Sequence, residues 1–80
     1  MMYLHIGKDY LLNTNEIIGI FDINSLKETK CYEGLIENVN MVEDLSDNNC
    51  KTLILTVEDS TKKAYISNIL STTIANRSNW

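Results

Sequence analysis

Apolar and polar residues alternate at the start of the chain, a pattern typical of a strand with one buried face. Over residues 2–6, Leu4 and Ile6 fall on one side and Tyr3 and His5 on the other. Gly7 then opens a turn, because glycine takes positive φ without steric cost. We therefore predict a first strand with Tyr3 and His5 on its outer side.

Two more strands are predicted before the middle of the chain. Residues 10–12 form a short strand, and residues 16–22 form an almost continuous apolar, β-branched run. Such a run suits a strand buried on both faces, or one shared between the core and an interface. Gly19 within it indicates either a bulge or the close approach of another backbone.

The hydrophobic period then changes to that of a helix. Ser25 and Glu28 match the capping box S-x-x-E, which predicts a helix over residues 26–38. Gly34 weakens this helix by about 1 kcal/mol relative to alanine, unless its missing side chain allows tight packing. The apolar face of the predicted helix contains Cys31, Tyr32, Leu35, Ile36 and Val39.

The second half of the chain predicts a polar loop, a hairpin and a short helix. Residues 43–51 are acidic and polar, which indicates a solvated loop. Residues 52–58 and 63–66 read as the two strands of a hairpin. A short helix capped near Ser71 is predicted next, and residues 78–80 are expected to fray.

These elements predict one α+β domain over residues 1–80: a small antiparallel sheet, one long covering helix and a short C-terminal helix, in the order β-β-β-α-β-β-α. One helix covers only one sheet face. The other face, lined by Ile18, Phe21 and Ile54, would leave an apolar patch too large to stay in water. We therefore expect a homo-oligomer, a dimer or a ring, with an interface that also includes Tyr3 and His5.

Composition narrows the class of protein. An apolar share of 44% excludes a wholly disordered chain. No apolar run approaches the roughly 20 residues of a membrane span, and no signal-peptide pattern opens the sequence, so we expect a cytoplasmic protein without a membrane partner. In that compartment Cys31 and Cys50 are expected to be free thiols, and with a lone histidine they complete no zinc set.

No catalytic or cofactor motif is present in the sequence. His5 has no nucleophile and orienting group beside it, so we expect no enzyme and no small-molecule substrate. The acidic residues Glu43, Asp44 and Asp47 lack the spacing of a calcium loop, and neither glycine-rich nucleotide motif occurs. We expect neither a metal nor a cofactor.

The net charge of −4 argues against strong electrostatic binding of DNA by a single subunit. Four cations are candidates for one local basic patch: Lys51, Lys62, Lys63 and Arg77. Four phosphate contacts bind weakly at physiological salt, whereas an assembly that repeats them gains by multivalency. The alternative interpretation is that these four are scattered surface charges.

Three blocks of sequence resemble the short RemB proteins of the RemA/RemB family of Gram-positive bacteria. Residues 2–7, MYLHIG, are close to the pattern M-Y-[IL]-H-[IL]-G, and residues 16–22, EIIGIFD, are close to D-I-[IV]-[AG]-I-[FL]-D. Residues 65–74 together with Arg77 resemble Y-[IY]-S-P-[IL]-S-S-S-T-L-x-x-R. In the final helix the family tends to carry Lys-Lys-Arg, where this chain has Ala75, Asn76 and Arg77.

The resemblance implies a regulator of matrix genes that binds DNA and assembles into rings. It implies a fold similar to LytTR-type DNA-binding domains, with DNA read mainly through its backbone and shape. The alternative is an acidic module of the same fold that assembles with itself or a protein partner and does not bind DNA. The low pI of about 4.7 favours this alternative.

Overall fold

A four-stranded mixed sheet forms the centre of the molecule. The computed structural model describes residues 3–8 and 10–78. Parts of three predicted elements lie outside these residues: Met2 of the first strand, Asp9 of the first turn and residues 79–80 of the frayed tail. In chain order the elements are β1 (Tyr3–Gly7), β2 (Tyr10–Asn13), the 3-10 helix η1 (Thr14–Glu16), β3 (Ile17–Asp22), α1 (Ile23–Glu28), α2 (Tyr32–Glu37), β4 (Met41–Asp44), β5 (Thr52–Glu58), β6 (Thr61–Ser67) and α3 (Ser71–Ser78).

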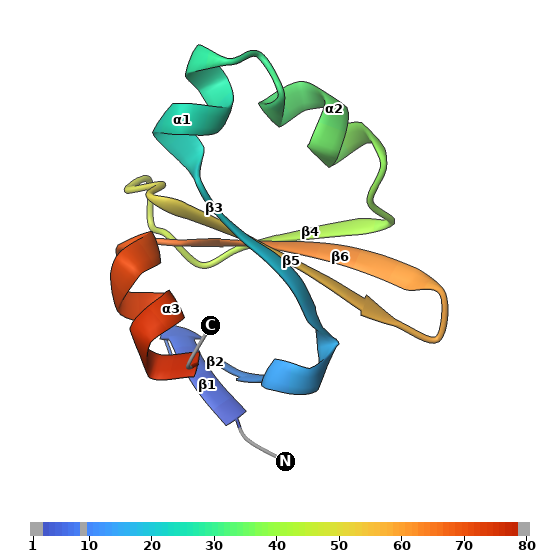
Figure 1. Cartoon of the computed structure of the whole chain (residues 1–80), viewed down its shortest axis with the longest axis vertical. Coiled ribbons are helices and arrows are strands. Elements are labelled where there is room, and N and C mark those ends of the chain that lie inside the picture. Colours follow the sequence, from blue (N-terminus) through green and yellow to red (C-terminus); the bar gives the residue numbers. More distant parts are fainter. Residues whose placement is uncertain (1–2, 9, 79–80) are drawn as a thin grey trace.

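The strand order of the central sheet is β3-β5-β6-β4, and β1 and β2 form a separate two-stranded ribbon. β3, β5 and β6 are antiparallel neighbours, whereas β4 runs parallel to β6 (Figure 1). The predicted α+β class is confirmed. The sheet, however, is mixed rather than antiparallel, and the element order has an additional helix and strand. Similarity to LytTR-type domains stays a prediction.

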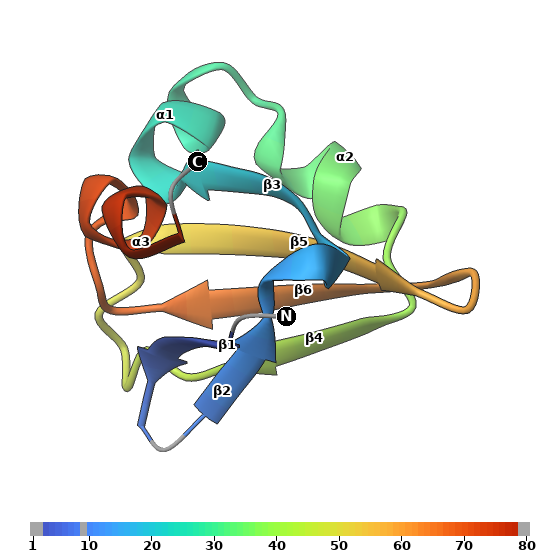
Figure 2. The ribbon, with the colours of Figure 1, turned by 60° about the horizontal axis from the view of Figure 1, so that its bottom comes forward.

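Both faces of the central sheet are covered. Along β5, Leu53 packs into an apolar cluster with α1 and α2, while the next residue, Ile54, packs into a second cluster with the ribbon and α3. This alternation follows from the two-residue period of a strand. Figures 1 and 2 show α1 and α2 on one side of the sheet and the ribbon with α3 on the other.

This arrangement corrects the expected interface. Ile54 has an exposed fraction of 0%, so it belongs to the core beneath the ribbon and not to an open face. Phe21 is half-buried against the helices, and of the three residues expected on the open sheet face only Ile18, 48% exposed, is open to solvent. An uncovered sheet face therefore does not supply the drive for self-association.

The predicted long helix is two short helices. The Asp22 carboxylate caps α1 by accepting a hydrogen bond from the Asn24 amide at 2.9 Å, so the helix begins before Ser25 and the predicted capping box does not form. Thr29 ends α1, and Lys30 has a φ of 61°, which a helix cannot continue. Within residues 3–8 and 10–78, no helix has the length and apolar character needed to span a bilayer.

Two of the predicted backbone features are confirmed. Gly7 has a φ of +142°, and the register of β3 against β5 shifts between Ile17 and Gly19, which is the expected bulge. The close neighbour at Gly19 is a side chain rather than another backbone: an added Cβ would lie 2.5 Å from the Phe21 ring. The bulge leaves Ile18 facing solvent.

Candidate assembly and nucleic-acid surfaces

The outer face of the β1–β2 ribbon is the most apolar exposed surface among the predicted interface residues. Tyr3 pairs with Asn13 and His5 with Leu11, and the exposed fractions of Tyr3 and Leu11 are 58% and 60%. The intervening Leu4 is buried against the sheet. Leu11 was not singled out from the sequence, although its place between Tyr10 and Leu12 in a short strand is the signal that would have found it.

Arg77 lies beside this ribbon. Its guanidinium donates a hydrogen bond to the His5 carbonyl at 3.3 Å, which joins α3 to β1. The His5 ring contacts the Lys8 carbonyl, so Lys8 lies on the same side of the molecule. One residue predicted to bind DNA therefore adjoins a residue predicted for assembly. Lys8 is a cation that sequence reasoning missed.

The four predicted DNA-binding cations do not form one patch on a single subunit. Lys51 precedes β5, where its amide donates to the Ser67 carbonyl at 3.0 Å, while Lys62 pairs with Val57 near the hairpin turn. Five strand positions separate those two ends of the ladder, from Thr52 to Val57, or about 17 Å at 3.4 Å per residue. Lys62 and its neighbour Lys63 point to opposite faces of β6.

Lys63 lies in a polar hollow rather than on an open basic surface. The hollow has a volume of about 300 Å³ and is lined by Glu16, Thr56, Glu58, Asp59, Thr61, Lys63 and Tyr65. Three of these side chains are carboxylates, so they offset the single positive charge. Partial burial raises the pKa of Glu16, and the neighbouring Glu58 carboxylate raises it further.

The raised pKa of Glu16 predicts a pH-dependent effect of its removal. A carboxyl with a raised pKa stabilises the fold below its ordinary value of 4.5, and this contribution is lost as the pH rises through the raised pKa. Glu16→Gln is therefore expected to raise the Tm relative to wild type at pH 7, with the difference closing near pH 4. Thermal melts at both pH values measure it, and Glu28→Gln, on exposed α1, controls for the loss of one charge. An equal gain for both variants would contradict the assignment.

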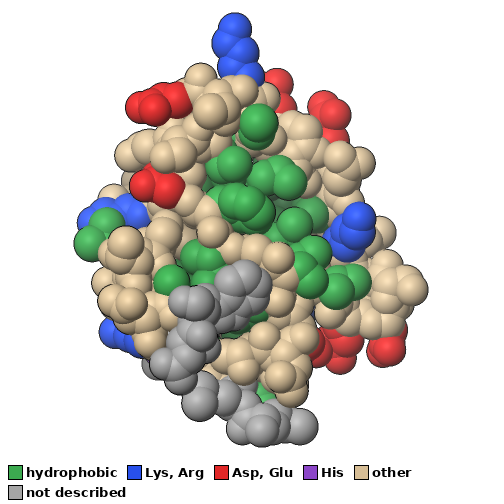
Figure 3. Space-filling view, viewed as in Figure 1, with side chains coloured by type: hydrophobic (Ala, Val, Ile, Leu, Met, Phe, Trp, Pro, Cys, Tyr) green, Lys and Arg blue, Asp and Glu red, His purple; other side chains and the backbone are tan. Residues whose placement is uncertain are grey.

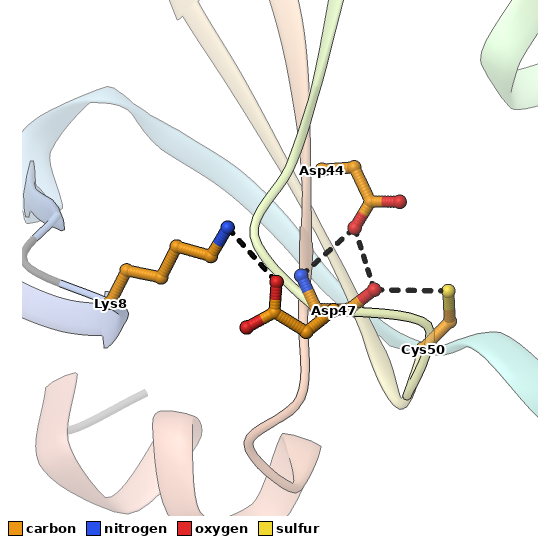
Figure 4. A network of polar contacts seen from close by, with 5 residues as sticks. Lys8, Asp44, Asp47 and Cys50 are labelled. Carbon is orange, nitrogen blue, oxygen red and sulfur yellow. Dashed lines mark hydrogen bonds and ion pairs between the residues drawn. The ribbon is translucent and has the colours of Figure 1, made fainter.

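A polar network fixes the loop that follows β4. The Ser46 hydroxyl and amide donate to the Asp44 carboxylate at 2.6 and 2.9 Å, and the Ser46 oxygen lies 3.2 Å from the Cys50 sulfur (Figure 4). These hydrogen bonds lower the pKa of Asp44. Lys8 forms an ion pair with Asp47 at 3.1 Å, which ties the ribbon to this loop. Leu45 and Ser46 are buried, so the predicted solvated loop is wrong at these two positions, and its first two residues, Glu43 and Asp44, belong to β4.

A bacterial regulatory protein is similar in sequence to this chain over nearly its whole length. The chain is 29% identical over 76 residues to extracellular matrix regulatory protein B of Bacillus subtilis (strain 168), an alignment that covers 95% of this chain and 89% of that protein. No protein-family model matches the chain. The resemblance that the three sequence blocks indicate is confirmed by this alignment.

Proposed function

The chain is RemB-like, and from this premise we propose that it is a non-enzymatic regulator of extracellular-matrix genes that acts as a cytoplasmic homo-oligomer. The observation that carries the proposal is the alignment with extracellular matrix regulatory protein B over 95% of this chain. An alignment of 76 of the 80 residues is far longer than any one of the three sequence blocks, so the relation is not limited to one motif.

Self-association is proposed through the outer face of the ribbon. Tyr3, His5 and Leu11 form an exposed strip there, and Ile18 is exposed on the edge strand β3. Aromatic residues are enriched at protein interfaces because they bury a large area and lose little side-chain freedom. Ile54 is not part of this surface, because it is fully buried.

DNA contact is proposed through Lys51, Lys62, Lys63 and Arg77, repeated around the oligomer. The separation of these cations within one subunit means that no single copy presents a continuous basic patch. Several copies side by side add their weak phosphate contacts on one DNA molecule, which raises the overall affinity by effective concentration. DNA would be contacted through its backbone and not through base edges.

A salt titration of DNA binding tests this proposal. Lys62→Glu combined with Arg77→Glu is expected to weaken binding to a duplex by about tenfold or more at low salt, because each reversal removes a phosphate contact and adds repulsion. Gel shift or fluorescence anisotropy over a range of salt concentrations measures the affinity and its salt slope. Lys27→Glu, at an exposed α1 residue that is not one of the four candidate cations, is the control for reversal of a surface charge. Absence of binding by the wild type at low salt, or unchanged binding by the double variant, would refute the site.

A second candidate function is that of an acidic interaction module that assembles without DNA. The carboxylates around Lys63 and the net charge of −4 favour it. Sedimentation of the wild type separates the two candidates when combined with the DNA titration. An oligomer that binds no DNA supports the module, and an oligomer that binds with a steep salt dependence supports the regulator.

A further inference from the structure

The edge strand β4 is exposed along its whole length. All four of its residues are exposed, and the apolar Met41 and Val42 have exposed fractions of 52% and 43%. β4 is the outermost strand of the central sheet on this side, so one row of its backbone groups faces outward. This edge is separate from the ribbon face proposed for self-association.

The direction of the backbone groups follows from the hydrogen bonds at the end of β4. The Leu45 amide donates inward to the Ile66 carbonyl at 2.8 Å, in the register that pairs Asp44 with Ile66. Inward and outward residues alternate along a strand in a parallel ladder, so Glu43 also faces β6 with its backbone. The backbone groups of Val42 and Asp44 therefore point away from the sheet.

The apolar side chains of β4 continue surfaces that the fold leaves partly open. Val42 is in register with Ala64, which belongs to the cluster under α1 and α2, so the two lie on the same sheet face. Figure 3 shows a continuous apolar patch beneath the two helices. A strand added outside β4 would place one side chain beside Val42 on this face and the next beside Met41 on the other.

The charges of β4 decide what kind of strand fits. Glu43 and Asp44 occupy its C-terminal half, and two hydrogen bonds from Ser46 keep Asp44 ionised. The nearby cations are Lys62 and Lys63 on the inner neighbour β6, beside the first half of β4, and Lys8, which is paired with Asp47.

A second copy of this chain is a poor occupant of the edge. Antiparallel pairing of β4 with its own copy has two compact registers: one sets the two Glu43 side chains opposite each other, where like charges repel, and the other pairs only residues 41–43 and sets Met41 opposite Glu43. The opposite sheet edge, β3, ends at Asp22 and follows Glu16, so it is no better suited. Lysine or arginine from a different chain would instead meet the carboxylates.

We propose that the outer edge of β4 binds an extended segment of a partner protein, by strand addition, in which two consecutive apolar residues adjoin two consecutive lysines or arginines. Outward backbone groups of Val42 and Asp44 supply hydrogen bonds, Met41 and Val42 supply apolar contacts on the two faces of the sheet, and Glu43 and Asp44 select the basic residues. A four-residue edge buries less than the roughly 1,000 Å² of a stable complex, so the interaction is weak and reversible.

Fluorescence anisotropy with two labelled synthetic peptides tests the proposal. One repeats two valines followed by two lysines, and the other repeats two valines followed by two glutamates. The lysine peptide is expected to bind the wild type about tenfold or more tightly than the glutamate peptide. Val42→Pro removes one outward amide, which an edge strand tolerates, and is expected to weaken lysine-peptide binding at least about tenfold. Val42→Ala keeps the amide and is expected to weaken it only about threefold.

Three results would overturn the proposal. These are no binding of the lysine peptide near millimolar concentration, equal affinities of Val42→Pro and Val42→Ala, and a wild-type oligomer, in the absence of peptide, that Val42→Pro dissociates. The last would identify a second copy as the occupant. Circular dichroism checks the fold of each variant. If Val42→Pro does not fold, the exposed double change Met41→Lys with Val42→Lys replaces it, with the same expected loss, because it removes the apolar contacts and repels the basic peptide.

Discussion

Ile54→Ala is expected to lower the free energy of unfolding by about 3–4 kcal/mol. The side chain is fully buried in the cluster formed by the sheet, the ribbon and α3, so its truncation loses transfer free energy and leaves a cavity. A domain of 80 residues has a total stability of about 4–12 kcal/mol, so much of it would be lost. Urea denaturation followed by circular dichroism measures the change.

Ile18→Ala is the matched control for this experiment. Ile18 is 48% exposed at the β3 bulge, so the same chemical change is expected to alter stability by no more than about 0.5 kcal/mol. If Ile18 lies in the assembly surface, its variant changes the mass of the oligomer and not the stability of the subunit. A stable Ile54→Ala subunit with reduced mass would instead return Ile54 to the interface.

Gly7→Ala is expected to destabilise the fold by about 2–3 kcal/mol. Gly7 has a φ of +142°, which residues with a side chain rarely adopt, so alanine at this position strains the backbone. Sterics add little, because the nearest atom to an added Cβ is the Leu45 Cβ at an ordinary 3.5 Å. The midpoint of urea denaturation, with an unchanged m-value, reports the loss.

Gly34→Ala is expected to give the opposite sign. Gly34 lies within α2, and nothing lies within 4 Å of an added Cβ, so the interpretation that it allows tight packing against the sheet is wrong. Alanine there is expected to stabilise the protein by about 0.5–1 kcal/mol through its helix propensity. A loss of stability at both glycines would contradict the different roles assigned to them.

The sequence predicted those parts of the fold whose signals are local. Alternation around Leu4 and Ile6 identified β1, and the apolar run before Asp59 identified β5. The turn at Asp59 and Ser60 closes the predicted hairpin with two positive φ values, 49° and 67°, typical of a two-residue hairpin loop. The predicted short helix is α3, which begins at Ser71.

The incorrect fold predictions have physical causes that a local sequence pattern does not reveal. β4 has four exposed residues, so it shows no alternation between buried and solvated positions, and its parallel partner β6 lies beyond a loop. The break after α1 depends on a left-handed Lys30, a residue type that gives no warning of positive φ. The second sheet face is covered because the ribbon folds back onto it, and this packing joins residues that are far apart in the sequence.

The candidate surfaces were predicted only in part for the same reason. Sequence reasoning chose Arg77 and His5 separately, one for DNA and one for assembly. Their contact depends on α3 packing against β1 across 72 residues of chain. Sequence reasoning also grouped Lys51 with Lys62, although these two residues lie near opposite ends of the hairpin.

The contact between Arg77 and His5 also bears on when the subunit can mature during its synthesis. β1 leaves the ribosome before α3, but part of its support comes from α3, which is translated later. Until then the ribbon lacks Ile74, the fully buried residue that α3 contributes to the shared cluster. Nascent chains on one messenger are therefore expected to remain unassembled through this surface, and pairing between subunits begins only after α3 has emerged.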